Sequence, residues 1–474
     1  MKRKNVDLLH GPVLGKLLTF SFPLVLTGWL QMLFNSADSM IVGRWGGEGA
    51  LASVGASFVL NMLIICFFGG LAAGVMVCAA QDWGAGDRES FDRTAHTAIL
   101  LAFLVGLFAT VLFEVLTVPV LTAMNVPVDI RPGAILYFRL YVLVIPGQMV
   151  YNSGASIMRA RGDSQRPLMF LTISGVCNVG LNLLFVIAFR WGVFGVGIAT
   201  VITQYLSAVL ALILLFHRGS EYGMRFSRLR LHKDKVIRIV RVGLPAGLQA
   251  SMLAASDIPL QACVNSLGSL AVAGNAAALN LDGFTFSAMM SLGQGCMVFT
   301  GQCVGARDFP RARKVLLNGM IMLVSVGAVV GWICVLFRTQ LVGLFQPGNA
   351  AAIAFGEQRV MAVCSLAFIY GFLESMNSSL RGYAVSLPQA VINGLGLFGF
   401  RTLWSIFYFP RHQDLFHLYL SYPVAWVLCI AAMASIYVPM VRRRVAQLTA
   451  EDAARSAVPA DSGSGGALPE NSGS

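Results

Sequence analysis

The sequence predicts an all-α polytopic membrane protein with twelve transmembrane helices. They are expected to form two six-helix lobes related by pseudo-two-fold symmetry along the membrane normal. Three observations support this prediction. The composition is that of a membrane protein, apolar runs of membrane-spanning length recur twelve times, and the second half of the chain repeats the first at an offset near 220 residues.

The amino-acid composition excludes most other classes of protein. Of the 474 residues, 57% are hydrophobic and 12% are charged, whereas a soluble globular chain has about 25% charged residues. This difference excludes a water-soluble enzyme and a disordered protein. The nine cysteines lie in or beside apolar stretches and form no CxxC pair, which indicates small buried side chains rather than disulfides or a metal site.

Apolar runs separated by charged residues, Gly and Pro predict the individual helices in order. The twelve expected spans are roughly 16–43, 50–80, 94–118, 133–158, 167–189, 193–217, 237–265, 270–302, 313–337, 354–380, 387–409 and 416–441. Spans longer than about 25 residues imply tilted or kinked helices. Pro23, Pro146 and Pro245 are placed to bend three of them.

The basic residues predict the orientation. The net charge is +12, and the Lys and Arg residues gather in short loops, which indicates membrane topology rather than nucleic-acid binding. The termini and the loops on their side hold 26 of these residues, against eight on the opposite side, where Arg359 and Arg401 are counted. We therefore expect a multi-pass monomer in a bacterial-type inner (plasma) membrane, surrounded by the lipid bilayer, with both termini in the cytoplasm.

These features divide the chain into five parts. We expect a cytoplasmic N-terminus (1–15), an N-lobe with six helices (16–217), a cytoplasmic inter-lobe loop (218–236), a C-lobe with six helices (237–441) and a cytoplasmic tail (442–474). The tail begins with basic residues. It is expected to be disordered from about Ala446, because Ala, Ser, Gly and Pro dominate its composition.

An internal repeat relates the two lobes. Residues 70–87 align without gaps with residues 291–308 and match at eight of eighteen positions, among them Gln81 with Gln302. Pro23 pairs with Pro245, and Arg161-Gly162 pairs with Arg381-Gly382. Because each half holds an even number of spans, both halves enter the membrane in the same direction. Parallel repeats of this kind are found in alternating-access transporters.

Several motifs resemble those of the multidrug and toxic compound extrusion (MATE) transporters, within the multidrug, oligosaccharidyl-lipid and polysaccharide exporter superfamily. The first span, FPLVLTGWLQMLFNSADSMIVGRWG, is similar to the first helix of that family. Gly301-Gln302-Cys303-Val304-Gly305-Ala306 resembles its GQ-x-x-GA motif, and Arg161-Gly162-Asp163-Ser164 with Pro167 resembles its RG-x-G-x-x-x-P motif. The resemblance spans residues 10–445. It implies two lobes around a central cavity, and the export of amphipathic, often cationic compounds in exchange for protons or sodium.

Asp38 is the strongest candidate for ion coupling. An ionisable group within a membrane span is costly and usually faces a cavity or a partner. A lone carboxylate in a helix bundle can hold a proton, because burial favours its neutral form, or it can bind sodium. The resemblance implies that Asn178, Asn182 and Thr200 accompany Asp38. Asn182 stands where the family often has a second acid, so we expect proton coupling rather than sodium coupling.

The second lobe offers three further acidic candidates, Glu374, Asp257 and Asp282. Some family members use acids of the seventh and tenth helices for coupling or for binding cationic drugs. Glu374 lies in the middle of the expected tenth span. The usual acid of the seventh helix falls near Leu253 here, and Asp257, one turn further along, is a possible substitute.

Aromatic and methionine side chains tolerate varied ligands and suit a pliable drug pocket. We expect the pocket between the lobes to include some of a small set of such residues. The candidates are Trp29, Met32, Tyr151, Phe284 and Met289.

The sequence therefore predicts a secondary active antiporter that exports amphipathic or cationic drugs or toxic metabolites by alternating access. We expect no cofactor, no metal site apart from sodium binding at Asp38 if sodium is the coupling ion, and no enzymatic activity. A flippase or exporter of a lipid-linked or polysaccharide precursor is the alternative. It is disfavoured by the few basic residues within the spans, because such a substrate carries a pyrophosphate. A membrane-embedded enzyme would need a motif such as HExxH, and ATP drive would need a Walker A motif, and the sequence has neither.

Overall fold

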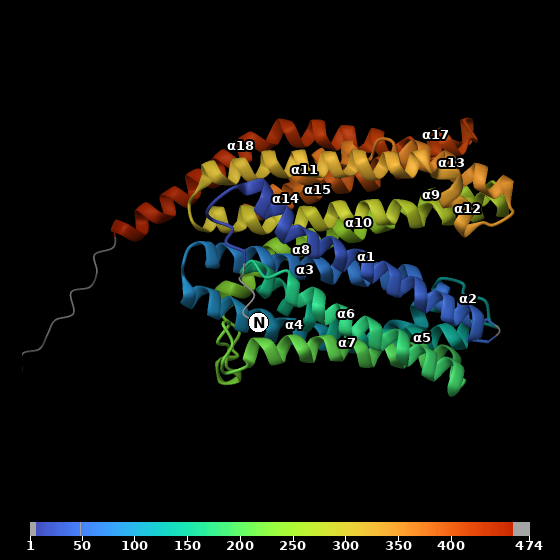
Figure 1. Ribbon diagram of the computed structural model, residues 1–474, viewed down its shortest axis with the longest axis horizontal. Helices are drawn as coiled ribbons and strands as arrows, with labels where there is room; N and C mark the ends of the chain where they lie inside the picture. The colour runs from blue at the N-terminus through green and yellow to red at the C-terminus, as the bar shows by residue number, and fades with distance from the viewer. Residues whose placement is uncertain (1–5, 48, 458–474) are drawn as a thin grey trace, which may run out of the picture.

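The computed structural model describes residues 6–47 and 49–457, and these form helices and connecting loops without a strand. Ten segments are long and apolar enough to cross a membrane. The helices α13 (Ala350–Cys364) and α14 (Ala367–Gly382), bent by 45° where they meet, make an eleventh. The long helix α10 (Ser269–Gly305) runs through the bundle beside them (Figure 1) and completes the twelve expected crossings.

The first half of the chain supplies six of these crossings. Its helices are α1 (Val13–Trp45), α2 (Ala50–Ala56), α3 (Phe58–Gly84), α4 (Arg88–Ala123), α5 (Arg131–Ala160), α6 (Gln165–Asn182) with the π-helix η1 (Leu183–Ala188), and α7 (Gly192–Phe216). The short α2 does not cross the bundle. A 3-10 turn, η2 (Phe226–Arg228), lies in the loop that leads to the second half.

The second half supplies the other six crossings. Its helices are α8 (Lys233–Ala255) with α9 (Asp257–Ser266), α10 (Ser269–Gly305), α11 (Phe309–Leu336), α12 (Arg338–Phe345), α13 (Ala350–Cys364) with α14 (Ala367–Gly382), α15 (Leu387–Asn393) to η5 (Phe409–Arg411), α17 (Leu415–Tyr419) and α18 (Ser421–Ala457). The segment from α15 to η5 includes η3 (Gly394–Phe400), α16 (Arg401–Leu403) and η4 (Trp404–Tyr408).

Equivalent local signals begin and end the helices of the two halves. Asp87 accepts a hydrogen bond from the backbone N–H of Ser90 and begins α4, and Asp308 accepts one from Arg311 and begins α11. After α5 and α14 the chain turns through left-handed residues, Gly162 with φ 89° and Ala384 with φ 61°. The structural repeat thus includes the turns as well as the helices.

The two halves meet along two close helix pairs, α1 with α10 and α3 with α8. Figure 1 shows these four helices between the remaining blue-to-green and yellow-to-red helices. Small residues allow the approach. A Cβ atom on Gly70 would lie 2.0 Å from the backbone nitrogen of Gly247, and one on Gly295 would lie 2.0 Å from the Ser21 hydroxyl. Close packing at such positions is how helices associate in lipid, where apolar burial gives little driving force.

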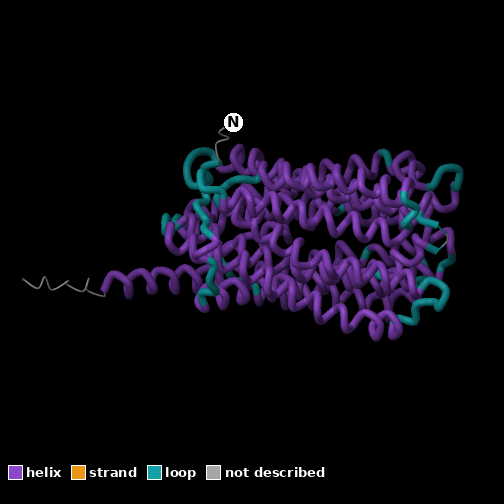
Figure 2. The backbone as a smooth tube through the Cα atoms, turned by 90° about the horizontal axis from the view of Figure 1, so that it is seen from below, coloured by secondary structure: helices purple, strands orange, loops and turns teal. Residues whose placement is uncertain are grey.

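One end of the bundle carries both ends of the described chain and the loop between the lobes (Figures 1 and 2). The turns after α3, α5, α10 and α14 lie there as well. We call this the basic end, because most of the loop Lys and Arg residues gather on it. The opposite end, near α2, α9 and α12, is called the far end.

The chain differs from expectation beyond Ala446. The sequence predicts disorder from there, but α18 continues to Ala457. Ala, Gln, Leu, Glu and Arg favour helix, and Asp452 forms a two-point ion pair with Arg307 at 2.6 and 2.7 Å. Of the expected termini, residues 1–5 and 458–474 lie outside the described part of the chain.

Candidate functional site

Asp38 lies at the centre of a small polar cluster in the first lobe. It projects from α1 toward α6, where Asn182 Nδ2 donates a hydrogen bond to its Oδ1 atom at 2.6 Å. Asn178 lies one helical turn before Asn182 on the same face of α6. With its amide nitrogen turned toward the carboxylate, Asn178 donates to Asp38 Oδ1 at 2.8 Å. The structure therefore brings together three of the four predicted residues.

The hydroxyl group of this cluster comes from a different residue than expected. Thr200 donates its hydroxyl to the Val196 carbonyl of its own helix at 2.9 Å. Thr203, one turn further along α7, lies 3.2 Å from the Asn178 amide. Both threonines are on the face of α7 toward α6, so the sequence identifies the helix but not the contact.

The cluster contains one negative charge and no positive one. No Lys, Arg or His in the described part of the chain lies within ion-pair distance of Asp38. Asn182 is fully buried, and its Oδ1 atom has no hydrogen-bond partner. The π-helix η1 begins directly after Asn182, and such interruptions are frequent at functional sites. The arrangement can accept a proton on the carboxylate or a small cation beside it.

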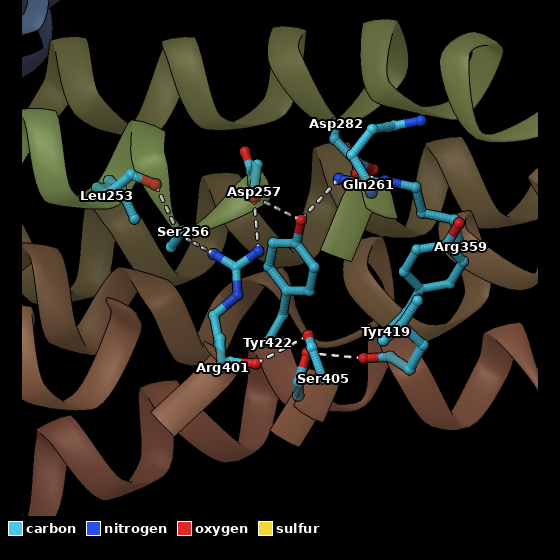
Figure 3. Close-up of polar contacts among 12 residues, drawn as sticks. Leu253, Ser256, Asp257, Gln261, Asp282, Arg359, Arg401, Ser405, Tyr419 and Tyr422 are labelled. Atoms are coloured by element: carbon cyan, nitrogen blue, oxygen red, sulfur yellow. Dashed lines mark hydrogen bonds and ion pairs between the residues drawn. The ribbon is translucent and has the colours of Figure 1, made fainter. Parts of the chain in front are cut away.

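The acidic candidates Asp257 and Asp282 of the second lobe have very different surroundings. Asp257 Oδ1 accepts hydrogen bonds from Arg401 at 2.6 Å and from the Tyr422 hydroxyl at 2.9 Å. Asp282 Oδ2 accepts one from Arg359 Nε at 2.6 Å. Figure 3 shows the Tyr422 ring between the two arginine–aspartate pairs. Each of these two carboxylates is therefore neutralised by the protein itself.

This network corrects the sequence-based count of loop arginines. Arg359 and Arg401 were assigned to the loops and helix ends opposite the termini, but only 4% and 2% of their surfaces are exposed. Arg359 also donates to Asn275 and Tyr422, and Arg401 donates to Ser256 at 2.7 Å. The sequence signal for this pairing is that Arg359 and Arg401 fall inside expected spans, as Asp257 and Asp282 do.

Glu374 occupies a third environment. It is buried in α14 and accepts hydrogen bonds from Ser378 at 3.1 Å and from the Tyr370 hydroxyl at 3.3 Å. Arg381, two helical turns further along, approaches it to 3.9 Å. A longer contact of 3.5 Å joins it to Asn377. Glu374 is thus partly compensated by a distant charge, between the extremes of Asp38 and Asp282.

The five pocket candidates fall into two groups. Trp29 donates its indole N–H to the Phe284 carbonyl at 3.0 Å, and Met32 packs against Gly283, so these side chains lie where α1 meets α10. Tyr151 and Met289 are buried. Tyr151 donates to the Pro167 carbonyl within the first lobe, and Met289 packs beneath Gly327 within the second. The Phe284 carbonyl, which accepts from Trp29, is likewise between the lobes.

A reciprocal pair of glutamines joins the lobes at the basic end. Gln81 Nε2 on α3 donates to the Gly382 carbonyl at 2.7 Å, and Gln302 Nε2 on α10 donates to the Ala160 carbonyl at the same distance. We call these two contacts the glutamine clasp. The sequence shows the repeat of these glutamines but not that each reaches into the opposite lobe.

The backbone around the clasp leaves no room for a side chain. A Cβ atom on Gly84 would lie 2.1 Å from the Gln302 carbonyl oxygen, and one on Gly305 would lie 2.0 Å from the Gln81 carbonyl oxygen. The accepting carbonyls follow the internal repeat as well. Residues 160 and 382 are 222 positions apart, nearly the same offset as that between Gln81 and Gln302. The sequence pairing of Arg161 with Arg381 is therefore corrected, since Arg159 is the structural counterpart of Arg381.

A buried ion cluster strengthens one side of the basic end. Asp82 on α3 accepts hydrogen bonds from Arg238 at 2.5 Å and Lys235 at 3.2 Å, both from α8 of the other lobe, and from Thr94 at 2.5 Å. Cys303 takes the equivalent position in the repeat. Among the described residues, opposite charges thus tie the lobes together at α3 and α8 but not at α10 and α1.

The comparisons with known proteins agree with this architecture. The family model described as MatE matches residues 23–184 and 245–407, one stretch in each lobe. The probable multidrug resistance protein YoeA of Bacillus subtilis is 24% identical over 430 residues, covering 88% of this chain and 92% of that protein. An FAD transporter of Shewanella oneidensis is 24% identical over 317 residues, covering 65% of this chain and 69% of that protein.

Solved structures share the fold. The crystal structure of MATE in complex with MaL6 has a TM-score of 0.86 at 20% identity and covers 94% of this chain and 100% of that one. A transporter of the MOP superfamily from Pyrococcus furiosus has a TM-score of 0.83 at 20% identity, covering 95% of this chain and 99% of that one. With the family model matched in both lobes, the chain belongs to the MatE family of multidrug efflux transporters.

Proposed function

We propose that the protein is a secondary active antiporter, in which an ion gradient drives the export of amphipathic or cationic compounds by alternating access. Protons are the proposed coupling ion, and Asp38 is the proposed site of coupling. The lone carboxylate, held only by neutral amides of α6, is the observation that carries this proposal. A carboxylate without a counter-charge inside a membrane protein is stabilised by taking up a cation.

The ligand set favours a proton over sodium. Asp38 is the only carboxylate of the described residues in this cluster, because Asn182 is an amide. A proton needs one carboxylate and one acceptor, and the unpartnered Asn182 Oδ1 atom is an acceptor of that kind. Sodium is a hard cation that gains from several oxygen ligands and from a second negative charge. We therefore expect sodium to bind weakly here.

The closed basic end supports the alternating-access part of the proposal. By the positive-inside rule this end faces the cytoplasm, with both termini, in a bacterial-type inner membrane. The glutamine clasp then closes the cytoplasmic side of the inter-lobe space. Both contacts join opposite lobes, so an inward-facing state requires both to break. A monomer suffices for this motion, because each contact lies within one chain.

The buried charges argue against a polysaccharide-precursor flippase as the alternative. Binding a pyrophosphate would require several cations free of protein carboxylates. Arg359 and Arg401 are instead engaged by Asp282 and Asp257 at 2.6 Å. The relative named as an FAD transporter indicates that cargo differs among proteins with this fold, so the choice of drug-like cargo rests on the multidrug resistance relatives.

The proposal is tested by dye efflux in proteoliposomes. A proton gradient and a sodium gradient are imposed separately, with ethidium as the cationic probe. We expect the wild-type protein to move ethidium against its gradient when only the proton gradient is present. Asp38→Asn keeps the shape of the side chain but carries neither a proton nor a charge, so driven transport is expected to fall to the protein-free level.

Asp129→Asn is the matched control, because Asp129 is an exposed residue in a turn at the far end. It should transport as the wild type does. Wild-type transport by Asp38→Asn would overturn the assignment of Asp38. Transport under a sodium gradient alone would overturn the choice of ion, and a lack of driven transport under both gradients would overturn the antiport itself.

A further inference from the structure

Arg159 is a partly buried arginine for which the described part of the chain provides no carboxylate. It lies in the last turn of α5, and its Nη1 atom donates to Gln294 Oε1 of α10, in the opposite lobe, at 3.2 Å. Its Nε atom is buried and has no hydrogen-bond partner. Within residues 6–47 and 49–457, no Asp or Glu lies within ion-pair distance of this group.

Other arginines of the bundle are compensated. The buried Arg359 and Arg401 each contact an aspartate at 2.6 Å, and the partly buried Arg238 contacts Asp82 at 2.5 Å. A buried charge without a partner costs several kcal/mol by comparison with its state in water. A membrane protein that keeps such a charge generally uses it for function.

The edge of the guanidinium that has no protein acceptor, Nε with Nη2, is the edge that arginine uses for two-point contacts with carboxylates. Gln294 engages Nη1, whereas no described side chain or carbonyl accepts from Nε or Nη2. A carboxylate can accept two parallel hydrogen bonds from these two atoms. The same structure contains this geometry at Arg307, whose Nε and Nη2 atoms donate to the two oxygens of Asp452.

The internal repeat shows which group is missing. Arg159 and Arg381 correspond in the repeat, because each directly precedes the residue whose carbonyl accepts from the glutamine clasp, Ala160 and Gly382. Arg381 has a carboxylate seven residues earlier on its own helix, Glu374, at 3.9 Å. The residue seven positions before Arg159 is Asn152. Residues seven apart lie two turns apart on one helix face. The second lobe therefore supplies an internal carboxylate at the position where the first lobe has a neutral amide.

We propose that the carboxylate of a transported compound binds at the Nε and Nη2 atoms of Arg159, with Gln294 of the other lobe on Nη1. It supplies the negative charge that Glu374 supplies to Arg381 in the second lobe. The favoured ligands are zwitterions, which combine an ammonium or other cationic group with a carboxylate. That the bound compound is transported rests on the proposed function, whereas the binding of a carboxylate at Arg159 does not. Because the two residues come from opposite lobes, separation of the lobes divides the site.

Binding to the purified full-length protein tests the site directly. The probes are a zwitterionic rhodamine with a free carboxylate and its methyl ester, which differ in that group alone, and binding is followed by fluorescence anisotropy. The wild-type protein should bind the free acid more tightly than the ester. Arg159→Gln should weaken binding of the free acid about tenfold or more and change binding of the ester less than about twofold.

Asn152→Glu is the decisive variant, because it keeps Arg159 and supplies the carboxylate of the second lobe. It should weaken binding of the free acid to a similar degree. A protein in which Arg159 were merely structural would not lose this preference on gaining an internal partner. Arg139→Gln is the control, because Arg139 lies on the same helix but is half exposed and paired with Glu114.

The outcomes separate this site from the antiport proposal. Wild-type preference for the ester, or unchanged binding of the free acid by Asn152→Glu, would overturn the site. Efflux of both probes from proteoliposomes is measured in parallel. If the ester is exported and the free acid is not, the carboxylate is no part of the cargo and the proposal fails. If neither probe moves under either gradient while the binding preference and its loss in Asn152→Glu persist, the site stands and the antiport proposal fails.

Discussion

The two lobes have the same fold but surround Asp38 of the first lobe and Asp257 and Asp282 of the second in opposite ways. In the first lobe Asp38 contacts two neutral amides and has no counter-charge among the described residues. In the second lobe Asp257 and Asp282 are each held by an arginine at 2.6 Å. The difference is not one of burial alone, because Asp282 is almost fully buried while half of the Asp257 side chain is exposed.

This contrast separates two uses of charge in one scaffold. A carboxylate without a counter-charge changes its energy strongly when a proton or cation arrives, so it can respond to an ion gradient. A carboxylate in a tight pair with arginine is already satisfied, and its main effect is to hold helices in a fixed arrangement. We therefore expect the first lobe to respond to the coupling ion and the network of the second lobe to be rigid.

The largest expected effect is on the stability of the second lobe. Arg359→Gln leaves Asp282 buried without its partner, which should destabilise the folded protein by about 3–5 kcal/mol. The double variant Arg359→Met with Asp282→Leu removes both charges and should recover much of that loss. Thermal unfolding in detergent, followed by the loss of monodisperse protein, measures both. Equal destabilisation by the single and double variants would contradict a pair that acts mainly through charge compensation.

The next effect concerns the basic end, where the lobes are alike. Gly305→Ala places a Cβ atom 2.0 Å from the Gln81 carbonyl oxygen, and Gly84→Ala places one 2.1 Å from the Gln302 carbonyl oxygen. Such overpacking should destabilise the closed state of the basic end by about 1–3 kcal/mol, because the backbone must shift to make room for the Cβ atom. Both variants should therefore shift the protein toward an open basic end to a similar degree.

Spin-label distances across the basic end, between single cysteines placed on α4 and α11 of a cysteine-free variant, measure that opening. Gly86→Ala provides a comparison, because nothing lies within 4 Å of its Cβ position and only its left-handed backbone is strained. A change in stability for Gly305→Ala with unchanged distances would mean that the clasp does not control the opening.

A smaller effect is expected on the stability of the first lobe. Asp38→Asn removes a charge that has no counter-charge and keeps an oxygen able to accept from Asn182. Its free energy of unfolding should change by about 1 kcal/mol or less, even though transport is lost. Thermal unfolding of this variant beside Arg359→Gln gives the comparison between the lobes directly. A loss as large as that of Arg359→Gln would show that Asp38 is structural as well.

Most of the fold could be predicted from the sequence, because hydropathy and the internal repeat are visible in the order of residues along the chain. Twelve spans, the two halves and the α6 partners of Asp38 followed from local patterns and from the family resemblance. The disorder expected from about Ala446 was wrong for residues 446–457, because composition does not register the contact between Asp452 and Arg307. A contact across 145 residues has no local signal in the chain.

The same limit applies to the site. Arg359 and Arg401 looked like loop charges, because a single sequence does not show that each faces an aspartate from a helix far away in the chain. Thr203 rather than Thr200 contacts Asn178, because the rotation of α7 about its axis is set by packing and not by its own residues. The identity of the charged residues was visible in the sequence, but their pairing depends on the tertiary structure.

The smallest effect is expected at the end of α18, which has no counterpart in the first lobe. Asp452 and Arg307 form a two-point ion pair, but about a third to a half of each side chain is exposed. Pairs of this kind contribute about 0–1 kcal/mol, because water solvates the separated charges well and both side chains lose freedom on pairing. Asp452→Asn should therefore change thermal stability less than any variant above. In 1 M salt the difference from the wild type should be smaller still, because the Debye length, over which salt screens exposed charges, is then about 3 Å. Hydrogen exchange of residues 446–457 should rise in this variant, because the pair ties the end of the helix to the turn between α10 and α11. A loss of stability comparable to that of Arg359→Gln would show that the end of α18 belongs to the rigid network of the second lobe.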